Sequence, residues 1–352
     1  MGRRASLGNG LGWVSCLGWV PCSTLVAPVT PFRRGCQPFI QRRCGTLTPS
    51  NWKILCSDDL EGFLCFVFDL NKKLTLKKEK ESSFFSLNRF FALSLPIKII
   101  DMNKIVLITG ATSGIGLGCA KKFTENGDKV ILTGRNEQRL AEIERELKEK
   151  GAQVLTLAFD VRNREKAMEK VAGLPEEWRE IDVLVNNAGL ALGLEPEYEG
   201  DLDDWETMID TNIKGLLLMT RLVVPGMVER GRGHIINVGS VAGDAAYAGG
   251  NVYCATKAAV KALTDGLRID VADTPIRVTN LKPGLVETNF SNIRFHGDTD
   301  RAAKLYTGIK PLTGDDIADV AVFAANAPAH VQIAEVLILA THQASGSVIV
   351  RK

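Results

Sequence analysis

Three polar residues in the second half of the chain have the types and spacing of a proton-transfer site. Tyr253 and Lys257 are four residues apart, so on a helix their side chains share one face. A lysine ammonium beside a phenol lowers the phenol pKa from about 10, which would make Tyr253 a general acid and base for an alcohol oxygen. Ser240 lies just after the apolar run Ile235–Val238 and is a candidate to hold the same oxygen. A Tyr and a Lys at this spacing also occur on ordinary packed helices, so the surrounding elements decide the interpretation.

A glycine-rich segment upstream offers a partner for this chemistry. The apolar run Ile105–Ile108 leads into Thr109–Gly116 (TGATSGIG), and a helical pattern follows. Gly110, Gly114 and Gly116 allow a tight turn and a close approach of backbone N–H groups to a pyrophosphate at the helix N-terminus. A glycine-rich turn can also serve only to reverse the chain, but the strand–turn–helix context is the one that a dinucleotide site requires.

The residues after the second apolar run predict which dinucleotide binds. An NAD site places an acidic residue there to hold the ribose 2′-hydroxyl, whereas this chain has Thr133-Gly134-Arg135-Asn136. The guanidinium of Arg135 suits a 2′-phosphate, which a carboxylate would repel. We therefore expect NADP(H) as the cofactor. The alternative is that Arg135 only caps or solvates the start of the next helix.

The apolar pattern from Met102 onward predicts the elements that position these residues. Short β-branched runs occur at Ile105–Ile108, Val130–Leu132, Val154–Phe159, Val183–Val185, Ile235–Val238, Ile276–Leu281 and Val336–Leu339. Helical segments lie between them, most clearly Asn136–Lys150. Near-continuous apolar strands that alternate with helices indicate a parallel sheet covered on both faces. We expect residues 102–352 to form a single α/β domain, a doubly wound seven-stranded parallel sheet of the Rossmann type.

Residues 1–101 differ in composition from the rest of the chain. They carry 14 Lys+Arg and seven Asp+Glu, whereas residues 102–352 carry 29 and 34. The first 57 residues contain no acidic residue and no sustained apolar period of 2 or 3.6, so no element is predicted there. We expect an irregular N-terminal extension, either a targeting leader or translated upstream sequence, without a part in the chemistry.

The composition of the whole chain argues against several classes of function. A net charge of +2 gives no reason to expect nucleic-acid binding, and no apolar run is long and unbroken enough for a membrane helix. The four His are scattered and no Cys pair has metal-ligand spacing, so no metal is expected. The residues around Ser240 do not form the G-x-S-x-G motif of a serine hydrolase. We expect a cytoplasmic protein, or an organellar one if the extension is a transit peptide.

The region from Met102 to about Gln343 resembles the short-chain dehydrogenase/reductase family. The resemblance rests on the glycine-rich turn, on Asn186-Asn187-Ala188-Gly189 and on an Asn–Ser–Tyr–Lys tetrad. More narrowly, the chain resembles the NADP-dependent 3-hydroxy acid dehydrogenases, also described as serine or L-allo-threonine dehydrogenases and malonic semialdehyde reductases. The closer match lies in the segments Asn186–Leu194, Asp204–Asn212, Tyr247–Tyr253, Pro283–Arg294 and Pro328–Val331. It departs at Ala340, where Pro is expected, and in the tail from Ala344.

The resemblance implies a role for each site residue. In the tetrad, Tyr253 would be the acid and base, Lys257 its activator and a ribose contact, Ser240 the group that orients the substrate oxygen, and Asn212 the anchor of a proton-relaying water. Cofactor contacts would come from Gly110, Ser113, Ile115 and Gly116 at the pyrophosphate, Arg135 at the 2′-phosphate, Asp160 and Val161 at the adenine, Asn187 with Ala188 and Gly189 near the ribose, and Pro283, Val286 and Thr288 at the nicotinamide.

The expected reaction transfers a hydride between NADP(H) and a small 3-hydroxy acid, or its keto or semialdehyde form, in a homotetramer. Arg294 is the only cation in the segment 287–294 and is a candidate to bind the substrate carboxylate. Alternatively, Arg294 pairs with acids of a neighbouring subunit or faces water. Two other functions stay open: a short-chain reductase of a 3-ketoacyl thioester or a sterol, and a non-catalytic NADP-sensing module. The second would be expected to lack Tyr253 or Lys257.

Overall fold

The computed structural model describes residues 52–55, 66–69 and 103–352. The chain divides into two units, Met1–Ala92 and Leu93–Lys352. In the first unit, strands β1 (Trp52–Leu55) and β2 (Phe66–Asp69) pair in antiparallel fashion, with Trp52 opposite Asp69. This pair is regular structure within an extension that we predicted to be irregular. The rest of the extension lies outside the described residues, and its boundary at residue 101 stays a prediction.

A parallel sheet of seven strands, all within residues 103–352, forms the centre of the second unit. Its strand order is β5-β4-β3-β6-β7-β8-β9. The strands are β3 (Ile105–Ile108), β4 (Lys129–Gly134), β5 (Val154–Ala158), β6 (Val183–Asn186), β7 (Gly233–Val238), β8 (Ile276–Pro283) and β9 (Glu335–Ile338). Each contains or overlaps the apolar run predicted for it, so the expected doubly wound fold is confirmed. The order reverses between β3 and β6, where such sheets bind ligands.

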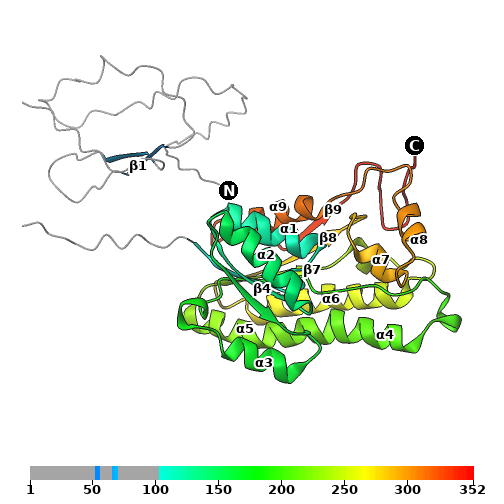
Figure 1. The fold of residues 1–352 in the computed structure, drawn as a ribbon, viewed down its shortest axis with the longest axis horizontal. Coiled ribbons are helices and arrows are strands. Elements are labelled where there is room, and N and C mark those ends of the chain that lie inside the picture. The colour runs from blue at the N-terminus through cyan, green and yellow to red at the C-terminus, as the bar shows by residue number, and fades with distance from the viewer. Residues whose placement is uncertain (1–51, 56–65, 70–102) are drawn as a thin grey trace, which may run out of the picture. The chain divides into compact units, whose positions relative to one another are not determined.

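Helices cover both faces of this sheet (Figure 1). One face carries α1 (Gly114–Glu125), α2 (Glu137–Glu149) and α9 (Gly314–Ala325). The other carries α3 (Arg164–Ala172), α4 (Leu202–Ile209), α5 (Leu216–Arg230) and α6 (Asn251–Asp270). The short helices α7 (Phe290–Arg294) and α8 (Thr299–Lys304) lie between β8 and α9 in the chain. No helix among residues 103–352 is long and apolar enough to cross a membrane.

Helix α2 illustrates how the sequence determines these elements. The side chain of Asn136 accepts a hydrogen bond from a backbone N–H of the first turn and so caps the helix. Leu140, Ile143 and Leu147 recur at helical spacing, and all three are buried against the sheet. After the helix, Gly151 adopts a φ of +87°, which ends the element. The helix predicted from Asn136 to Lys150 is therefore confirmed.

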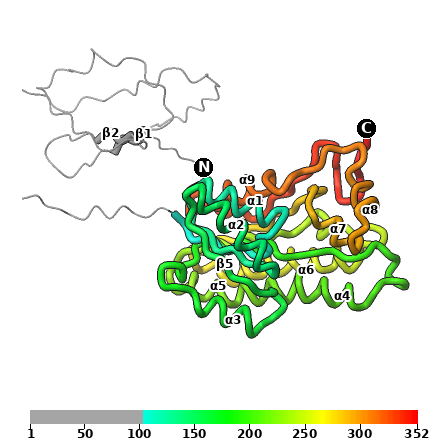
Figure 2. The backbone as a smooth tube through the Cα atoms, viewed as in Figure 1, coloured from blue at the N-terminus to red at the C-terminus, as the bar shows by residue number. Residues whose placement is uncertain are grey.

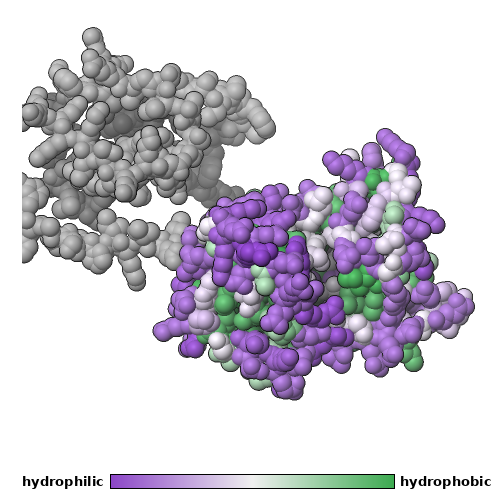
Figure 3. Space-filling model, viewed as in Figure 1, coloured by the Kyte–Doolittle hydropathy of each residue, from purple (hydrophilic) through white to green (hydrophobic). Residues whose placement is uncertain are grey.

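Alternate side chains of the strands pack into two cores, one on each face of the sheet. On β3, Val106 and Ile108 pack with α1, α2 and α9, whereas Ile105 and Leu107 pack with α3 and α5. Because both faces are buried, the strand is a continuous apolar run in the sequence. The surface seen in Figure 3 is mostly hydrophilic. Apolar residues form smaller patches on it, one of them near α7.

The α7–α8 segment and the C-terminal residues lie side by side (Figure 2). Nη1 of Arg351 donates to the carbonyl oxygens of Leu305 at 3.0 Å and Thr307 at 2.5 Å. The backbone N–H of Lys352 donates to the carbonyl oxygen of Gly308 at 2.9 Å. The tail from Ala344, where the family resemblance weakens, therefore packs against the turn that follows α8.

Candidate active site

A cleft of about 390 Å³ opens at the carboxyl ends of the strands, next to the point where the strand order reverses. The predicted site residues that line it are Gly110, Ser113, Ile115, Asn187, Ala188, Gly189, Ser240, Tyr253, Lys257, Pro283, Val286, Thr288 and Arg294. The predicted residues outside this lining are Gly116, Arg135, Asp160, Val161 and Asn212. The fold thus brings together residues that are far apart in the sequence.

The glycine-rich turn between β3 and α1 has the geometry of an anion cradle. Gly110 and Gly114 adopt φ values of +66° and +53°, a region that favours glycine. A Cβ atom on Gly116 would lie 2.5 Å from Nδ2 of Asn187, so a side chain there would separate α1 from the loop after β6. Ser113 occupies the N-cap position of α1, yet its side chain makes no capping hydrogen bond. The N–H groups of the first turn are therefore available to a phosphate.

Thr109 and Asn187 join this turn to the loop after β6. The hydroxyl of Thr109 accepts hydrogen bonds from the backbone N–H groups of Asn187 at 3.0 Å and Ala188 at 2.9 Å. In return, Nδ2 of Asn187 donates to the carbonyl oxygens of Thr109 at 2.8 Å and Gly110 at 3.1 Å. Thr109 was not among the predicted site residues. Its signal in the sequence is a polar residue at the carboxyl end of an apolar strand.

Asn212 lies in a π-helical turn, Asp210–Gly215, that joins α4 to α5. Its Nδ2 atom donates to the carbonyl oxygen of Leu190 at 2.8 Å and to the hydroxyl of Thr256 at 3.0 Å, and its Oδ1 atom accepts the N–H of Leu190 at 2.9 Å. Asn212 is buried behind Gly189, where an added Cβ atom would lie 3.2 Å from Oδ1. The helical turn is wider here than in an α-helix, and it directs this side chain to the loop after β6.

Tyr253, Lys257 and Ser240 meet at the cleft. Tyr253 and Lys257 lie on α6, and Nζ of Lys257 is 5.9 Å from the centroid of the Tyr253 ring. Nζ also donates to the carbonyl oxygen of Val238 at 2.8 Å. Ser240 follows β7 and begins a 3-10 turn, η4 (Val241–Gly243), and its hydroxyl lies close enough to Tyr253 to act on the pKa of the phenol. Burial lowers the pKa of Lys257 to about 8.

The pKa of Tyr253 is raised, not lowered as predicted. Burial of the phenol is the main cause, and nearby Tyr247 acts in the same direction. The hydrogen bond to Ser240 and the charge of Arg294 oppose the increase without cancelling it. The prediction that Lys257 sets the direction of the Tyr253 pKa shift is wrong. The loss of hydration of the buried phenolate outweighs the charge of a lysine that also donates to a backbone carbonyl oxygen. Tyr253 is therefore protonated at neutral pH.

Arg294 is buried at the end of α7, with 8% of its surface exposed. Its Nη1 atom donates to the hydroxyl of Tyr247 at 2.9 Å, and its Nε atom donates to the carbonyl oxygen of Gly193 at 3.1 Å. Nη2 is buried and has no hydrogen-bond partner among the residues that the structure describes. The alternative that Arg294 faces water is therefore wrong. Among residues 103–352, no acidic side chain pairs with this guanidinium, and the alternative of an acidic partner on a neighbouring subunit stays a prediction. Tyr247, which sequence reasoning missed as a site residue, also lines the cleft.

Arg135, Asp160 and Val161 lie beyond the ends of β4 and β5. Arg135 is exposed, and within residues 103–352 its guanidinium makes no hydrogen bond or ion pair. Nη2 of Arg162 donates to Oδ2 of Asp160 at 2.8 Å. Burial alone would raise the pKa of Asp160, but the hydrogen bonds from Arg162 and the charge of Arg135 hold it below its usual value. Arg162 was not predicted, although an arginine two residues after Asp160 is a visible signal.

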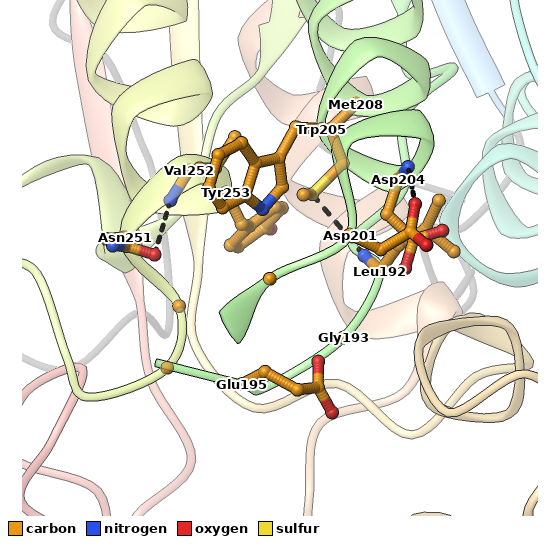
Figure 4. A pocket seen from close by; sticks show the side chains of 13 residues that line it. Leu192, Gly193, Glu195, Asp201, Asp204, Trp205, Met208, Asn251, Val252 and Tyr253 are labelled. Atoms are coloured by element: carbon orange, nitrogen blue, oxygen red, sulfur yellow. Dashed lines mark hydrogen bonds between the residues drawn. The ribbon is translucent and has the colours of Figure 1, made fainter. Parts of the chain in front are cut away.

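A small pocket is lined by Trp205 and Met208 of α4 and by Val252 and Tyr253 of α6, among others (Figure 4). Its volume of about 10 Å³ is enough for no more than one water molecule. No group of three or more His, Cys, Asp or Glu within residues 103–352 could hold a metal ion.

Comparisons with known proteins agree with this geometry. The family model described as short chain dehydrogenase matches residues 104–298. The NADP-dependent 3-hydroxy acid dehydrogenase YdfG of Salmonella typhi is 56% identical over 230 residues, which are 65% of this chain and 92% of that protein. The protein of the same name in Shigella flexneri is 53% identical over 230 residues, with the same shares of both chains. The closed form of a serine dehydrogenase complexed with NADP+ superimposes with a TM-score of 0.67 at 49% identity, covering 70% of this chain and 99% of that one.

Proposed function

Because this chain belongs to the short-chain dehydrogenase family, we propose that it is an NADP-dependent oxidoreductase of small 3-hydroxy acids. It transfers a hydride between NADP(H) and a substrate such as serine, L-allo-threonine or 3-hydroxypropionate, or the matching keto or semialdehyde compound. The names of the relatives support this substrate class. The observation that carries the proposal is a buried guanidinium, that of Arg294, 5.7 Å from the ring centroid of Tyr253.

The positions of Arg294 and Tyr253 indicate which class of substrate fits the cleft. Nη2 of Arg294 is buried and has no hydrogen-bond partner within residues 103–352, and a buried unpaired N–H group is costly. A substrate carboxylate would satisfy this atom with a charge-assisted hydrogen bond. The hydroxyl of the same substrate would then lie toward Tyr253, whose ring centroid is 5.7 Å from the guanidinium carbon. A sterol has no anionic group for this guanidinium, so the buried cation favours a small anionic alcohol.

The residues of the cleft divide the proton chemistry among them. NADP+, when bound, supplies the acceptor for the hydride that leaves the substrate carbon. Tyr253 donates its proton to the substrate oxygen in the reduction direction and takes the proton back in the oxidation direction. Ser240 orients that oxygen through its hydroxyl. Lys257 favours the phenolate once Tyr253 has given up its proton, and Asn212 anchors the water that exchanges the proton with solvent.

The residues present fit the cofactor. The glycine-rich turn offers a close backbone approach and unsatisfied N–H groups at Ser113 and Ile115 for the pyrophosphate. Arg135 has no partner among residues 103–352 and would hold the 2′-phosphate, while Val161 would pack against the adenine. Asn187, Ala188 and Gly189 would lie along the ribose. The residues proposed for the nicotinamide side of the cleft are Pro283, Val286 and Thr288.

The proposal includes a cytoplasmic homotetramer. Exposed apolar side chains on opposite faces of the sheet support two different contacts between copies, as a dihedral tetramer requires. Ile269 on α6 is 75% exposed and Leu217 on α5 is 44% exposed, whereas Phe323 on α9 is 67% exposed. Sedimentation measures the assembly. A fluorescent fusion made with and without residues 1–101 distinguishes the cytoplasm from import into an organelle.

The function is tested by measuring NADPH formation from NADP+ with purified protein and a panel of alcohols. L-serine, L-allo-threonine, 3-hydroxypropionate and 3-hydroxybutyrate represent the proposed class. Matched uncharged secondary alcohols, a 3-hydroxyacyl thioester and a hydroxysteroid represent the other short-chain reductases. The proposal requires the highest kcat/KM with a 3-hydroxy acid. A preference for the thioester or the steroid would assign the chain to another substrate, and NADPH binding without turnover of any alcohol would indicate a sensing module.

A further inference from the structure

Lys282 is a buried cation that the proposed chemistry does not use. It lies on β8 directly before Pro283, with 6% of its surface exposed, and it does not line the cleft. Its Nζ atom is 2.8 Å from Oδ2 of Asp244 and 2.5 Å from Oε1 of Glu335. Burial alone would lower the pKa of Lys282, but the hydrogen bonds to Asp244 and Glu335 raise it, so Lys282 stays charged.

Asp244 closes the short turn that Ser240 begins. The hydroxyl of Ser240 accepts the backbone N–H of Ala242 at 3.1 Å, and the N–H of Gly243 donates to the carbonyl oxygen of Ser240 at 3.0 Å. The N–H of Asp244 then donates to the carbonyl oxygen of Val241 at 3.2 Å. Because these bonds link all five residues, a force on the side chain of Asp244 acts on the position of Ser240.

The same turn is fixed on its other side by α6. A Cβ atom on Gly243 would lie 2.7 Å from the carbonyl oxygen of Lys257, so the turn rests directly on the backbone of the helix that carries Tyr253 and Lys257. Before the turn, the N–H of Gly239 donates to the carbonyl oxygen of Leu281 on β8 at 2.7 Å. The segment that carries Ser240 is thus held between α6 and β8. It contacts β8 through the backbone of Gly239 before the turn and through the ion pair of Asp244 with Lys282 after the turn.

We propose that Lys282 is a positioning residue, which acts through Asp244 to hold the hydroxyl of Ser240 in place beside Tyr253. The proposal rests on the dehydrogenase function proposed above, in which Ser240 orients the substrate oxygen. A misplacement of about 1 Å in an orienting group can cost about a hundredfold in rate. A three-residue turn that is tied to the sheet by a side-chain ion pair is sensitive to the loss of that ion pair.

The two carboxylates around Lys282 provide a matched pair of variants. Asp244 connects Lys282 to the Ser240 turn, whereas Glu335 connects it to β9 at the edge of the sheet. Glu335 has a second hydrogen bond, from Nδ2 of Asn280 at 3.4 Å. Asp244→Asn removes the charged contact with the turn, and Glu335→Gln removes the charged contact with the edge strand. A purely structural role predicts similar effects of the two substitutions on activity.

The test compares the full-length chain with the Lys282→Met, Lys282→Arg, Asp244→Asn and Glu335→Gln variants. Three quantities are measured: kcat and KM with the best 3-hydroxy acid, the affinity for NADPH from its fluorescence, and hydrogen exchange in residues 240–244. We expect Lys282→Met and Asp244→Asn to lower kcat about tenfold to a hundredfold, with unchanged NADPH affinity and faster exchange in the turn. Lys282→Arg restores most of kcat because it keeps both ion pairs. Glu335→Gln changes kcat by less than about threefold.

Equal losses in Asp244→Asn and Glu335→Gln would overturn the proposal, as would a parallel loss of kcat and NADPH affinity in Asp244→Asn. Should Lys282→Met fail to fold, the comparison of the two carboxylate variants still decides. If the wild-type protein oxidises none of the alcohols, the proposed function fails separately. Hydrogen exchange then decides on positioning: faster exchange in Asp244→Asn but not in Glu335→Gln supports it, and equal exchange contradicts it.

Discussion

The guanidinium carbon of Arg294 lies 5.7 Å from the ring centroid of Tyr253, and Nη1 of the same arginine donates a hydrogen bond to the hydroxyl of Tyr247. This contact joins the α7 segment, which follows β8, to the helix that carries the proposed acid and base. A buried cation and a protonated phenol are thereby held at a fixed separation. The pair is preorganised for a ligand with an anionic group at one end and an oxygen at the other, because neither side chain has to move to reach it.

The first prediction concerns Arg294. Arg294→Ala should lower kcat/KM for a 3-hydroxy acid by about ten- to a hundredfold, the usual value of a charge-assisted hydrogen bond. An uncharged secondary alcohol of the same size should lose much less. Arg301→Ala is the matched control, because Arg301 lies on α8, stacks over Phe295 and pairs with Glu195 outside the cleft. An unchanged ratio between the charged and uncharged substrates would remove Arg294 from substrate recognition.

The second prediction concerns Tyr253. Tyr253→Phe removes the transferable proton and should lower kcat by about a hundredfold or more, while NADPH binding stays nearly unchanged. Lys257→Met should reduce both, because it removes the cation beside the phenol and a proposed ribose contact. Tyr198→Phe, at a side chain that is 85% exposed, is the control for loss of a hydroxyl. Substantial turnover by the Tyr253→Phe variant would mean that another group moves the proton.

The sheet and the glycine-rich turn could be predicted because local patterns determine them. The apolar runs of β3 and β7, and the helical spacing of Leu140, Ile143 and Leu147, can be recognised within each segment without knowledge of the rest of the chain. The family resemblance stated from the motifs is confirmed, since the family model matches residues 104–298. The same patterns correctly predicted that the strand ends converge, which is a consequence of a parallel arrangement.

Other features depend on contacts between distant segments and could not be predicted. The direction of the Tyr253 pKa shift depends on burial beneath Phe290 and Arg294, which are 37 and 41 residues further along the chain. The π-helical turn at Asn212 has no clear signal in the residue types. In the sequence, Lys282 looks like an ordinary charged residue at the end of a strand. Its two carboxylate partners, Asp244 and Glu335, lie 38 and 53 residues away.

The third prediction concerns the cofactor. Arg135→Ala should raise KM for NADP+ by at least about tenfold and leave KM for NAD+ nearly unchanged, because it removes a partner of the 2′-phosphate alone. Arg162→Ala should have a smaller effect, since Asp160 already holds this guanidinium. Steady-state kinetics with both cofactors provide the measurement. Equal losses with NADP+ and NAD+ would assign Arg135 to the stability of the α2 start.

The fourth prediction concerns the extension. A chain that starts at Met102 should have the same kcat, KM and melting temperature as the full chain. The first strand of the seven-stranded sheet begins at Ile105, and the proposed site residues lie between Gly110 and Arg294. Circular dichroism and the NADP+ assay compare the two proteins. Loss of solubility or activity on truncation would make residues 1–101 part of the functional fold.

The last prediction concerns acid stability and His234, a buried residue of β7 whose Nε2 atom lies 2.7 Å from the hydroxyl of Thr279. Burial lowers the pKa of His234 to about 3, and the charges of Arg277 and Lys104 act in the same direction. In the unfolded chain a histidine titrates near about 6.5, so between these pH values the unfolded state binds one more proton than the folded state. The free energy of unfolding should therefore fall as the pH decreases from about 6.5 toward 3, by up to about 1.4 kcal/mol for each pH unit.

Urea unfolding at pH 7 and pH 4.5 measures this loss, which should be about 2 kcal/mol smaller in His234→Gln, because glutamine keeps a hydrogen-bonding group near Thr279 but takes up no proton. His330→Gln, at an exposed position, should retain the wild-type loss. The same loss in wild type and His234→Gln would show that other groups determine the acid sensitivity of the fold.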